Sequence, residues 1–333
     1  MRRCSTCKHL AKICAPALFR NIANPKDPQD VLDLLDYLGD IGRFVKHLEL
    51  TLHGVSGDIL AEIVKRCSDL RCLTVKYVIG YKWYSPELLA AIMLLPALTD
   101  LRFTNYPNLP WIDSSGEDIT QIMFEPLLGS HGDKLRALKI LGKGTLGSGS
   151  FASLTRDAPR LVELELCHGL DFRLQRSFAE SSTWACATHL QSLTIVDCHG
   201  LYADIFTQKL ASGVFGQPQK VSLKMHDSSP EKTPPGPIEW TIPALDTFKL
   251  DFFTTWEMEH LQLIHAKKVF LSRVCRQRTY KMVIQQIAHK STFPEATEIH
   301  VTTSLSGEDF RELQRVCSAR GVKTIARDWD RRG

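Results

Sequence analysis

The feature that most constrains the fold is a short apolar pattern that recurs along the chain. It is clearest at Leu190-Gln-Ser-Leu193-Thr-Ile195-Val-Asp-Cys198, which reads L-x-x-L-x-L-x-x-C. Three apolar residues at such offsets arise often by chance, so one match indicates little. The number of matches and the intervals between them decide whether the pattern is structural.

The pattern occurs ten times, closely in six segments and in degenerate form in four. We call the middle apolar residue of each match its anchor. The anchors are Leu48, Leu73, Leu101, Leu138, Leu164, Leu193, Val221, Phe248, Val269 and Ile299, and Ile325 is a proposed eleventh. Eight of the ten intervals between them are 25 to 30 residues, and the other two are 37 and 21. Periods in the twenties are typical of leucine-rich repeats, in which each match is a short strand.

Helix signals lie between the predicted strands. Asp27 followed by Pro28 predicts a helix over 28–38 that Gly39 ends. Ser85 before Pro86 marks a second start, and Ser306 a third, whose helix buries Phe310, Leu313 and Cys317 and ends at Gly321. We therefore predict an α/β leucine-rich-repeat solenoid of about ten strand–helix repeats over residues 45–333, with the parallel sheet on its concave face, behind an N-terminal helical cap at 1–44.

Charge and composition limit the kinds of partner and the cell compartment that we expect. The net charge is +4, from 41 basic and 37 acidic residues, which argues against nucleic acid or an anionic membrane as the partner. The longest apolar run, 88–98, contains Pro96 and is too short to span a bilayer. Ten cysteines without a secretory signal indicate a reduced protein, which we expect in the cytoplasm or nucleus.

Three motifs contain residue types that occur in nucleotide-binding or metal-binding sites. Gly142-Lys-Gly144-Thr-Leu-Gly147-Ser-Gly149 contains G-x-G-x-x-G, but a turn between repeats explains the 142–149 segment better than a nucleotide-binding loop, because no other nucleotide or kinase element follows. Cys4, Cys7, His9 and Cys14 are zinc-ligand types that lack a second closely spaced pair, and an apolar helix face explains them without metal. Cys167-His and Cys198-His are near-copies out of register with each other. We therefore expect no catalytic residue, no cofactor and no metal.

The residues that flank the anchors carry the expected function. Positions −1, +1 and +3 from each anchor face away from the core, toward the concave side. The candidate partner-binding residues are Arg102, Glu163, Glu165, Lys220, Lys224, Lys249, Lys268 and His300. The repeats anchored at 221, 248 and 269 hold four lysines against one aspartate, a pattern that suits a protein partner of complementary charge. The alternative is that these are ordinary solvated side chains. The Pro-rich segment 226–243 is a surface loop, near the binding face or merely tolerated.

Residues 7–22 add a family resemblance. Cys7-Lys-His-Leu-Ala-Lys-Ile-Cys-Ala-Pro-Ala-Leu-Phe-Arg-Asn-Ile22 resembles the second half of an F-box, and the helix and repeats that follow look like those of fungal F-box/leucine-rich-repeat proteins. The Leu-Pro-x-Glu opening of the first half is missing from this sequence. The resemblance implies a substrate receptor of an SCF-type ubiquitin ligase. In such a receptor Leu10, Leu18, Phe19 and Ile22 would belong to the helical region that binds the adaptor subunit, and the repeats would hold the substrate. The alternative is a stand-alone repeat scaffold or inhibitor without a ligase link.

Overall fold

The computed structural model describes residues 19–22, 28–52, 55–77, 85–105, 126–141, 158–167, 189–196, 203–213, 215–224, 239–251, 264–272, 277–289, 292–302 and 307–327. Contacts group the chain into two compact units, residues 1–161 (unit 1) and 162–333 (unit 2).

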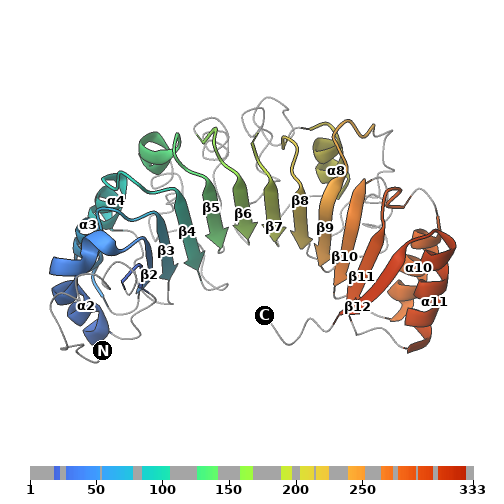
Figure 1. The fold of residues 1–333 in the computed structure, drawn as a ribbon, viewed down its shortest axis with the longest axis horizontal. Helices are drawn as coiled ribbons and strands as arrows, with labels where there is room; N and C mark the ends of the chain where they lie inside the picture. Colours follow the sequence, from blue (N-terminus) through green and yellow to red (C-terminus); the bar gives the residue numbers. More distant parts are fainter. Residues whose placement is uncertain are drawn as a thin grey trace, which may run out of the picture. The chain divides into compact units, whose positions relative to one another are not determined.

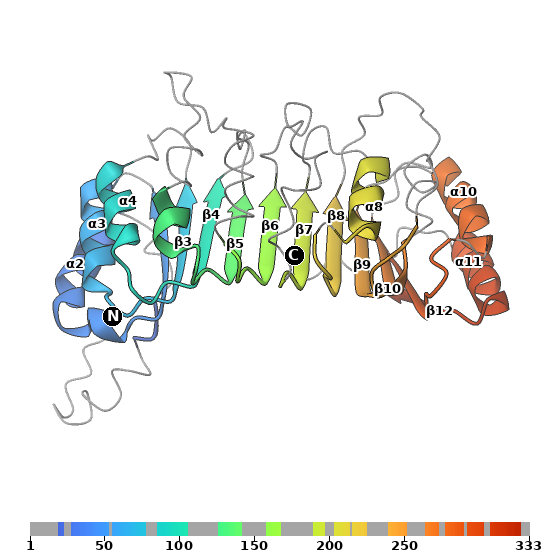
Figure 2. The same ribbon diagram turned by 90° about the horizontal axis from the view of Figure 1, so that it is seen from above.

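Unit 1 contains five parallel strands in chain order among its described residues (Figure 1). They are β1 (Asn21–Ile22), β2 (His47–Leu52), β3 (Cys72–Tyr77), β4 (Asp100–Asn105) and β5 (Ala137–Leu141). The helices are α2 (Pro28–Ile41), the 3-10 turn η1 (Gly42–Phe44), α3 (Gly57–Arg66) and α4 (Pro86–Met93). Helices α2, α3 and α4 pack in sequence, α2 on α3 and α3 on α4, along one side of the strands (Figures 1 and 2), and residues 126–131 form a further short helical segment ahead of β5.

Unit 2 continues the same scheme with seven parallel strands among its described residues. They are β6 (Glu163–Cys167), β7 (Ser192–Val196), β8 (Lys220–Lys224), β9 (Leu245–Asp251), β10 (Ala266–Ser272), β11 (Glu298–Thr302) and β12 (Lys323–Arg327). The helices are α8 (Ala203–Ala211), α10 (Gln277–Ala288) and α11 (Gly307–Ala319). The last two pack on each other, and α11 also contacts β12 (Figure 2).

The anchors are in register within each unit. Leu48 pairs with Leu73, which pairs with Leu101 and then Leu138. In unit 2 the corresponding row runs Leu164, Leu193, Val221, Phe248, Val269 and Ile299. All ten anchors are at most 3% exposed. One face of each sheet is therefore the core, the other face is what we call the open face, and the predicted leucine-rich-repeat α/β fold is confirmed.

The two ends of the repeat array correct two details of the prediction. Ile325 is not an anchor, because Thr324 pairs with Ile299 while Ile325 pairs with His300 on the open face. Val322 fills the core ahead of this strand and is only 5% exposed, which shifts β12 by one residue. Gly39 does not end α2, which continues to Ile41, because its exposed position leaves the helical path free.

The predicted helix starts and stops are otherwise confirmed where they can be followed. The Ser85 hydroxyl accepts a hydrogen bond from the Leu88 N–H at 3.2 Å, so it is the N-cap of α4. Leu313 and Cys317 are buried in α11, and Gly321 follows with φ of +75°, the left-handed conformation expected at a helix end. No helix within the described ranges is long and apolar enough to cross a membrane.

Candidate recognition surface

The open face of unit 2 brings together side chains from neighbouring strands. At position +1 the register runs Ser222, Lys249, Phe270, His300 and Ile325 from β8 to β12. At position −1 it runs Lys220, Thr247, Lys268, Glu298 and Lys323. We call Lys220, Lys249, Lys268, Phe270 and His300 the aromatic–lysine patch. Adjacent strands are about 4.8 Å apart, so these five residues span roughly three strand intervals.

An aromatic stack forms the centre of the patch. The rings of Phe270 and His300 are nearly parallel, with centroids 4.2 Å apart and planes 10° from each other. His300 Nε2 lies 3.0 Å from Glu298 Oε2. This hydrogen bond, followed by the charge of nearby Lys268, lowers the pKa of the Glu298 carboxyl. An ionised carboxylate only accepts hydrogen bonds, so Nε2 carries the hydrogen.

The exposure of the patch differs from residue to residue. His300 is only 2% exposed, and the Phe270 ring that stacks beside it from the neighbouring strand is half-buried. The Lys268 side chain is 49% exposed and its Nζ lies 3.5 Å from Glu298. Lys220 is exposed and Lys249 half-buried. A partner that approaches this face would therefore meet the half-buried Phe270 ring, one face of which is covered by His300, and the side chains of three lysines.

The other candidate residues occupy different places. Glu163 and Glu165 lie on β6, two strands before Lys220. Lys224 is in register with Asp251, so its surroundings are less basic than the sequence alone indicated. Arg102 is exposed on β4 of unit 1. The structure therefore groups Lys220, Lys249, Lys268 and His300, whereas Glu163, Glu165 and Arg102 lie apart from them along the chain of strands or in the other unit.

The F-box-like residues are only partly described. Phe19 lies in a bend, with its ring centroid 6.3 Å from that of Tyr37 on α2. Ile22 is in strand β1, paired with Leu48, whereas the resemblance implied a helical region. A parallel strand was available to receive this segment at the edge of the sheet. Leu10 and Leu18 lie outside the described residues, and adaptor binding by all four stays a prediction.

The chemical motifs also lie largely outside the described residues. This applies to the glycine segment 142–149, to the cysteines and histidine between 4 and 14, and to 226–238 of the Pro-rich segment. Within the described ranges, no three His, Cys, Asp or Glu side chains are grouped so that they could hold a metal ion.

Sequence reasoning missed two features of these surfaces. It counted charges at the flanking positions and overlooked the apolar Phe270, although its +1 position next to Val269 was readable. It also passed over position −2, where Arg20, Lys46, Arg71 and Arg136 form a basic edge in unit 1. Arg20 carried no signal, because β1 lacks the repeat pattern.

Comparison with known proteins gives a limited result. No protein-family model matches the chain, and no curated protein matches it. Among solved structures, the leucine-rich repeat-containing protein LegL7 from Legionella pneumophila is similar at 12% sequence identity, over 93% of this chain and 91% of that chain, with a TM-score of 0.40.

Proposed function

We propose that the chain is a non-catalytic protein-recognition module whose aromatic–lysine patch binds an acidic surface of a partner protein. The observation that supports this most directly is the Phe270–His300 stack with Lys249 and Lys268 beside it in register. Aromatic side chains at the centre of a charged rim are typical of residues that dominate protein–protein binding energy.

Phe270 and the lysines of the patch contribute to binding in different ways. The half-buried Phe270 ring packs face to face against the His300 ring of the neighbouring strand, which restricts its rotation, so a partner buries it with little loss of side-chain freedom. The ammonium groups of Lys220 and Lys249 would steer an acidic surface toward it and disfavour basic ones. Lys268 Nζ lies 3.5 Å from Glu298 Oε2, and this ion pair offsets part of its charge.

The test compares two variants that change the patch with a control variant that changes charge elsewhere in unit 2. Lys220→Glu/Lys249→Glu reverses charge on the patch, and Phe270→Ala removes the ring; Lys281→Glu/Arg311→Glu, at exposed positions of α10 and α11, is the matched control for charge reversal. A partner captured by the wild type is purified and titrated against each variant. We expect at least about tenfold weaker binding for the first two, the effect of roughly 1.4 kcal/mol, and no change for the control. Equal affinity for all of them would refute the patch as the binding surface.

The resemblance of residues 7–22 to half an F-box supports a finer proposal, that the bound partner is a substrate delivered to an SCF-type ubiquitin ligase. Phe19 and Ile22 would then contribute to adaptor binding together with Leu10 and Leu18. The competing proposal is a scaffold or inhibitor that holds the same partner without a ligase.

A direct pull-down separates these two proposals. The purified ligase adaptor is mixed with the chain, alone and extended by any sequence encoded in frame upstream of Met1. Adaptor binding that Leu18→Ala weakens supports the ligase receptor. Absence of adaptor binding in both forms, while the patch still binds its partner, leaves the scaffold as the function.

A further inference from the structure

A column of cations lines the N-terminal edge of the strands in unit 1. One residue before the paired positions of β1 to β5, the register runs Arg20, Lys46, Arg71, Thr99 and Arg136. Four of these five side chains are basic. The equivalent positions in unit 2 are Val162, Gln191, Gln219, Asp246, Lys267, Thr297 and Val322, where the one lysine is paired with the one aspartate at 2.9 Å. The basic column is therefore a property of unit 1 and does not follow from the repeat itself.

Backbone hydrogen bonds fix the spacing of this column. The Arg20 carbonyl accepts hydrogen bonds from the N–H groups of Lys46 and His47 at 2.9 and 3.0 Å. The carbonyls of Lys46, Arg71 and Thr99 each accept two from the following strand in the same way, at 2.8 to 3.2 Å. Arg20, Lys46 and Arg71 consequently follow one another at the strand interval of about 4.8 Å, and Arg136 follows two intervals after Arg71.

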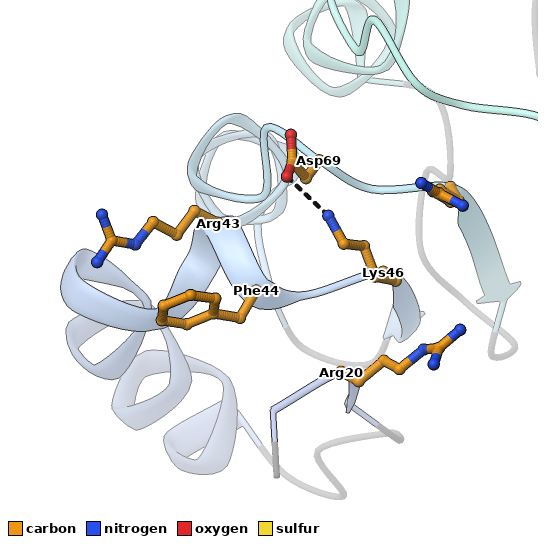
Figure 3. A pocket seen from close by; sticks show the side chains of 6 residues that line it. Arg20, Arg43, Phe44, Lys46 and Asp69 are labelled. Carbon is orange, nitrogen blue, oxygen red and sulfur yellow. Dashed lines mark hydrogen bonds and ion pairs between the residues drawn. The ribbon is translucent and has the colours of Figure 1, made fainter. Parts of the chain in front are cut away.

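Two cavities open along this edge. The first, of about 360 Å³, is lined by Arg20, Arg43, Phe44, Lys46, Asp69 and Arg71 (Figure 3). The second, of about 390 Å³, is lined by Pro96, Ala97, Thr99, Lys134, Arg136 and Arg160. Together the linings hold seven basic side chains and a single carboxylate. Both cavities have the volume of small-ligand sites.

The single carboxylate is already neutralised. Asp69 Oδ2 lies 2.7 Å from Lys46 Nζ, and this hydrogen bond is the main cause of the lowered pKa of the Asp69 carboxyl. Arg20, Arg43 and Arg71 therefore remain as the cations of the first cavity that an incoming anion meets. The Arg43 guanidinium carbon lies 4.8 Å from the centre of the Phe44 ring, which gives that cation an apolar side.

The arrangement favours several separate carboxylates over one phosphate. Phosphate sites usually draw on convergent side chains and on free backbone N–H groups. Here the N–H groups of Lys46, His47, Arg71 and Cys72 all donate to strand carbonyls. Figure 3 shows that the guanidinium groups of Arg20 and Arg43 point away from each other and do not converge on one point. Singly charged groups spread along a chain match this geometry better.

We propose that the N-terminal edge of the strands in unit 1 binds an extended acidic protein segment through the Arg20–Arg136 column. From Arg71, just before β3, to Arg136, just before β5, is two strand intervals, roughly 10 Å. Extended backbone rises about 3.3 Å per residue, so the segment carries acidic residues about three positions apart. This surface is separate from the aromatic–lysine patch, and the two proposals stand or fall independently.

The experiment uses the full chain and labelled peptides of about twelve residues, followed by fluorescence anisotropy. One peptide has Glu residues about three positions apart, and its control has Gln at the same positions. We expect the wild type to bind the acidic peptide only, with affinity that falls by about tenfold between roughly 0.05 and 0.3 M salt as charges are screened. Arg71→Glu/Arg136→Glu should weaken binding by at least about tenfold, and Arg71→Gln/Arg136→Gln by less. Unchanged circular dichroism and thermal melting check that these exposed substitutions leave the fold intact.

Three controls locate the site. Lys281→Glu/Lys323→Glu makes the same change in net charge within unit 2 and should bind the peptide like the wild type; equal weakening would mean non-specific attraction and overturn the proposal. Loss of binding only in Lys220→Glu/Lys249→Glu would place the peptide on the open face of unit 2, also against it. Displacement of the peptide by inorganic phosphate at concentrations that leave a matched chloride control unaffected would assign the cavities to phosphate instead.

Discussion

Burial sets the acid–base behaviour of single residues in this fold, and Cys67 is the clearest case. It follows α3 and is fully buried. Burial raises the pKa of its thiol from 9.0 to about 12, because the thiolate would lose its hydration. The folded protein therefore keeps the Cys67 thiol neutral over a pH range in which the unfolded chain ionises it.

This difference predicts a loss of stability at alkaline pH. The thiol contributes its full stability below pH 9.0 and loses it as the pH rises toward about 12, since the folded pKa is the higher one. We expect the free energy of unfolding of the wild type to fall relative to that of Cys67→Ala by about 1 kcal/mol per pH unit above 9. Urea denaturation of both proteins between pH 8 and about 10.5 measures it. Parallel curves for the two proteins would contradict the assigned pKa.

Single residues also show which features can be predicted from the sequence and which cannot. The anchors were predictable, because the residues at positions one, four and six of each repeat are buried and therefore apolar, and this pattern recurs along the sequence. The Phe270–His300 stack was not, because neighbours on β10 and β11 are 30 residues apart and ring orientation depends on side-chain packing. Ile325 was misassigned because an apolar residue in a terminal strand has no following repeat to fix its register.

At the scale of elements, α2 and α3 meet through a close backbone approach. Arg66 at the end of α3 donates a hydrogen bond from its Nη1 to the Leu35 carbonyl of α2 at 2.6 Å. A Cβ placed on Gly42, in the turn η1 that follows α2, would overlap the Arg66 carbonyl. Gly39, three residues earlier in α2, has nothing within 4 Å of its Cβ position. Near the end of α2, Gly42 therefore has no room for a side chain, whereas Gly39 has.

These glycines give a matched pair of substitutions. Gly42→Ala is expected to destabilise the protein by about 1–3 kcal/mol, because backbone atoms must move apart to admit the methyl group. Gly39→Ala is expected to stabilise it by about 0.5–1 kcal/mol, because alanine lowers the entropy cost of forming the helix. Chemical denaturation of the two variants and the wild type measures these changes in the free energy of unfolding. A stabilising Gly42→Ala would show that α2 and α3 are not held this closely.

Helices were harder to predict than strands for a physical reason. Ser85 and Pro86 mark a helix start because the cap and the missing N–H are local features of the chain. By contrast α8 and α10 carry no such cap signal; α8 buries Phe206 and Leu210, and α10 packs on α11. The basic column is another case: Lys46, Arg71 and Arg136 are readable at position −2 of their repeats, but Arg20 joins them only through the pairing of β1 with β2.

At the scale of the whole molecule, a repeat array couples each strand mainly to its neighbours. Leu193 on β7 is 0% exposed and lies in register between Leu164 and Val221. Leu193→Asp buries an unpaired carboxylate, which should cost more than about 4 kcal/mol locally. We expect hydrogen exchange to accelerate in β6, β7 and β8, while β2 and β3 keep the protection of the wild type. Ser192→Asp, between Glu163 and Lys220 on the open face, is the control and should leave exchange unchanged. If β2 and β3 lose protection as much as β7 does, the chain unfolds as a single cooperative body and nearest-neighbour coupling does not describe it.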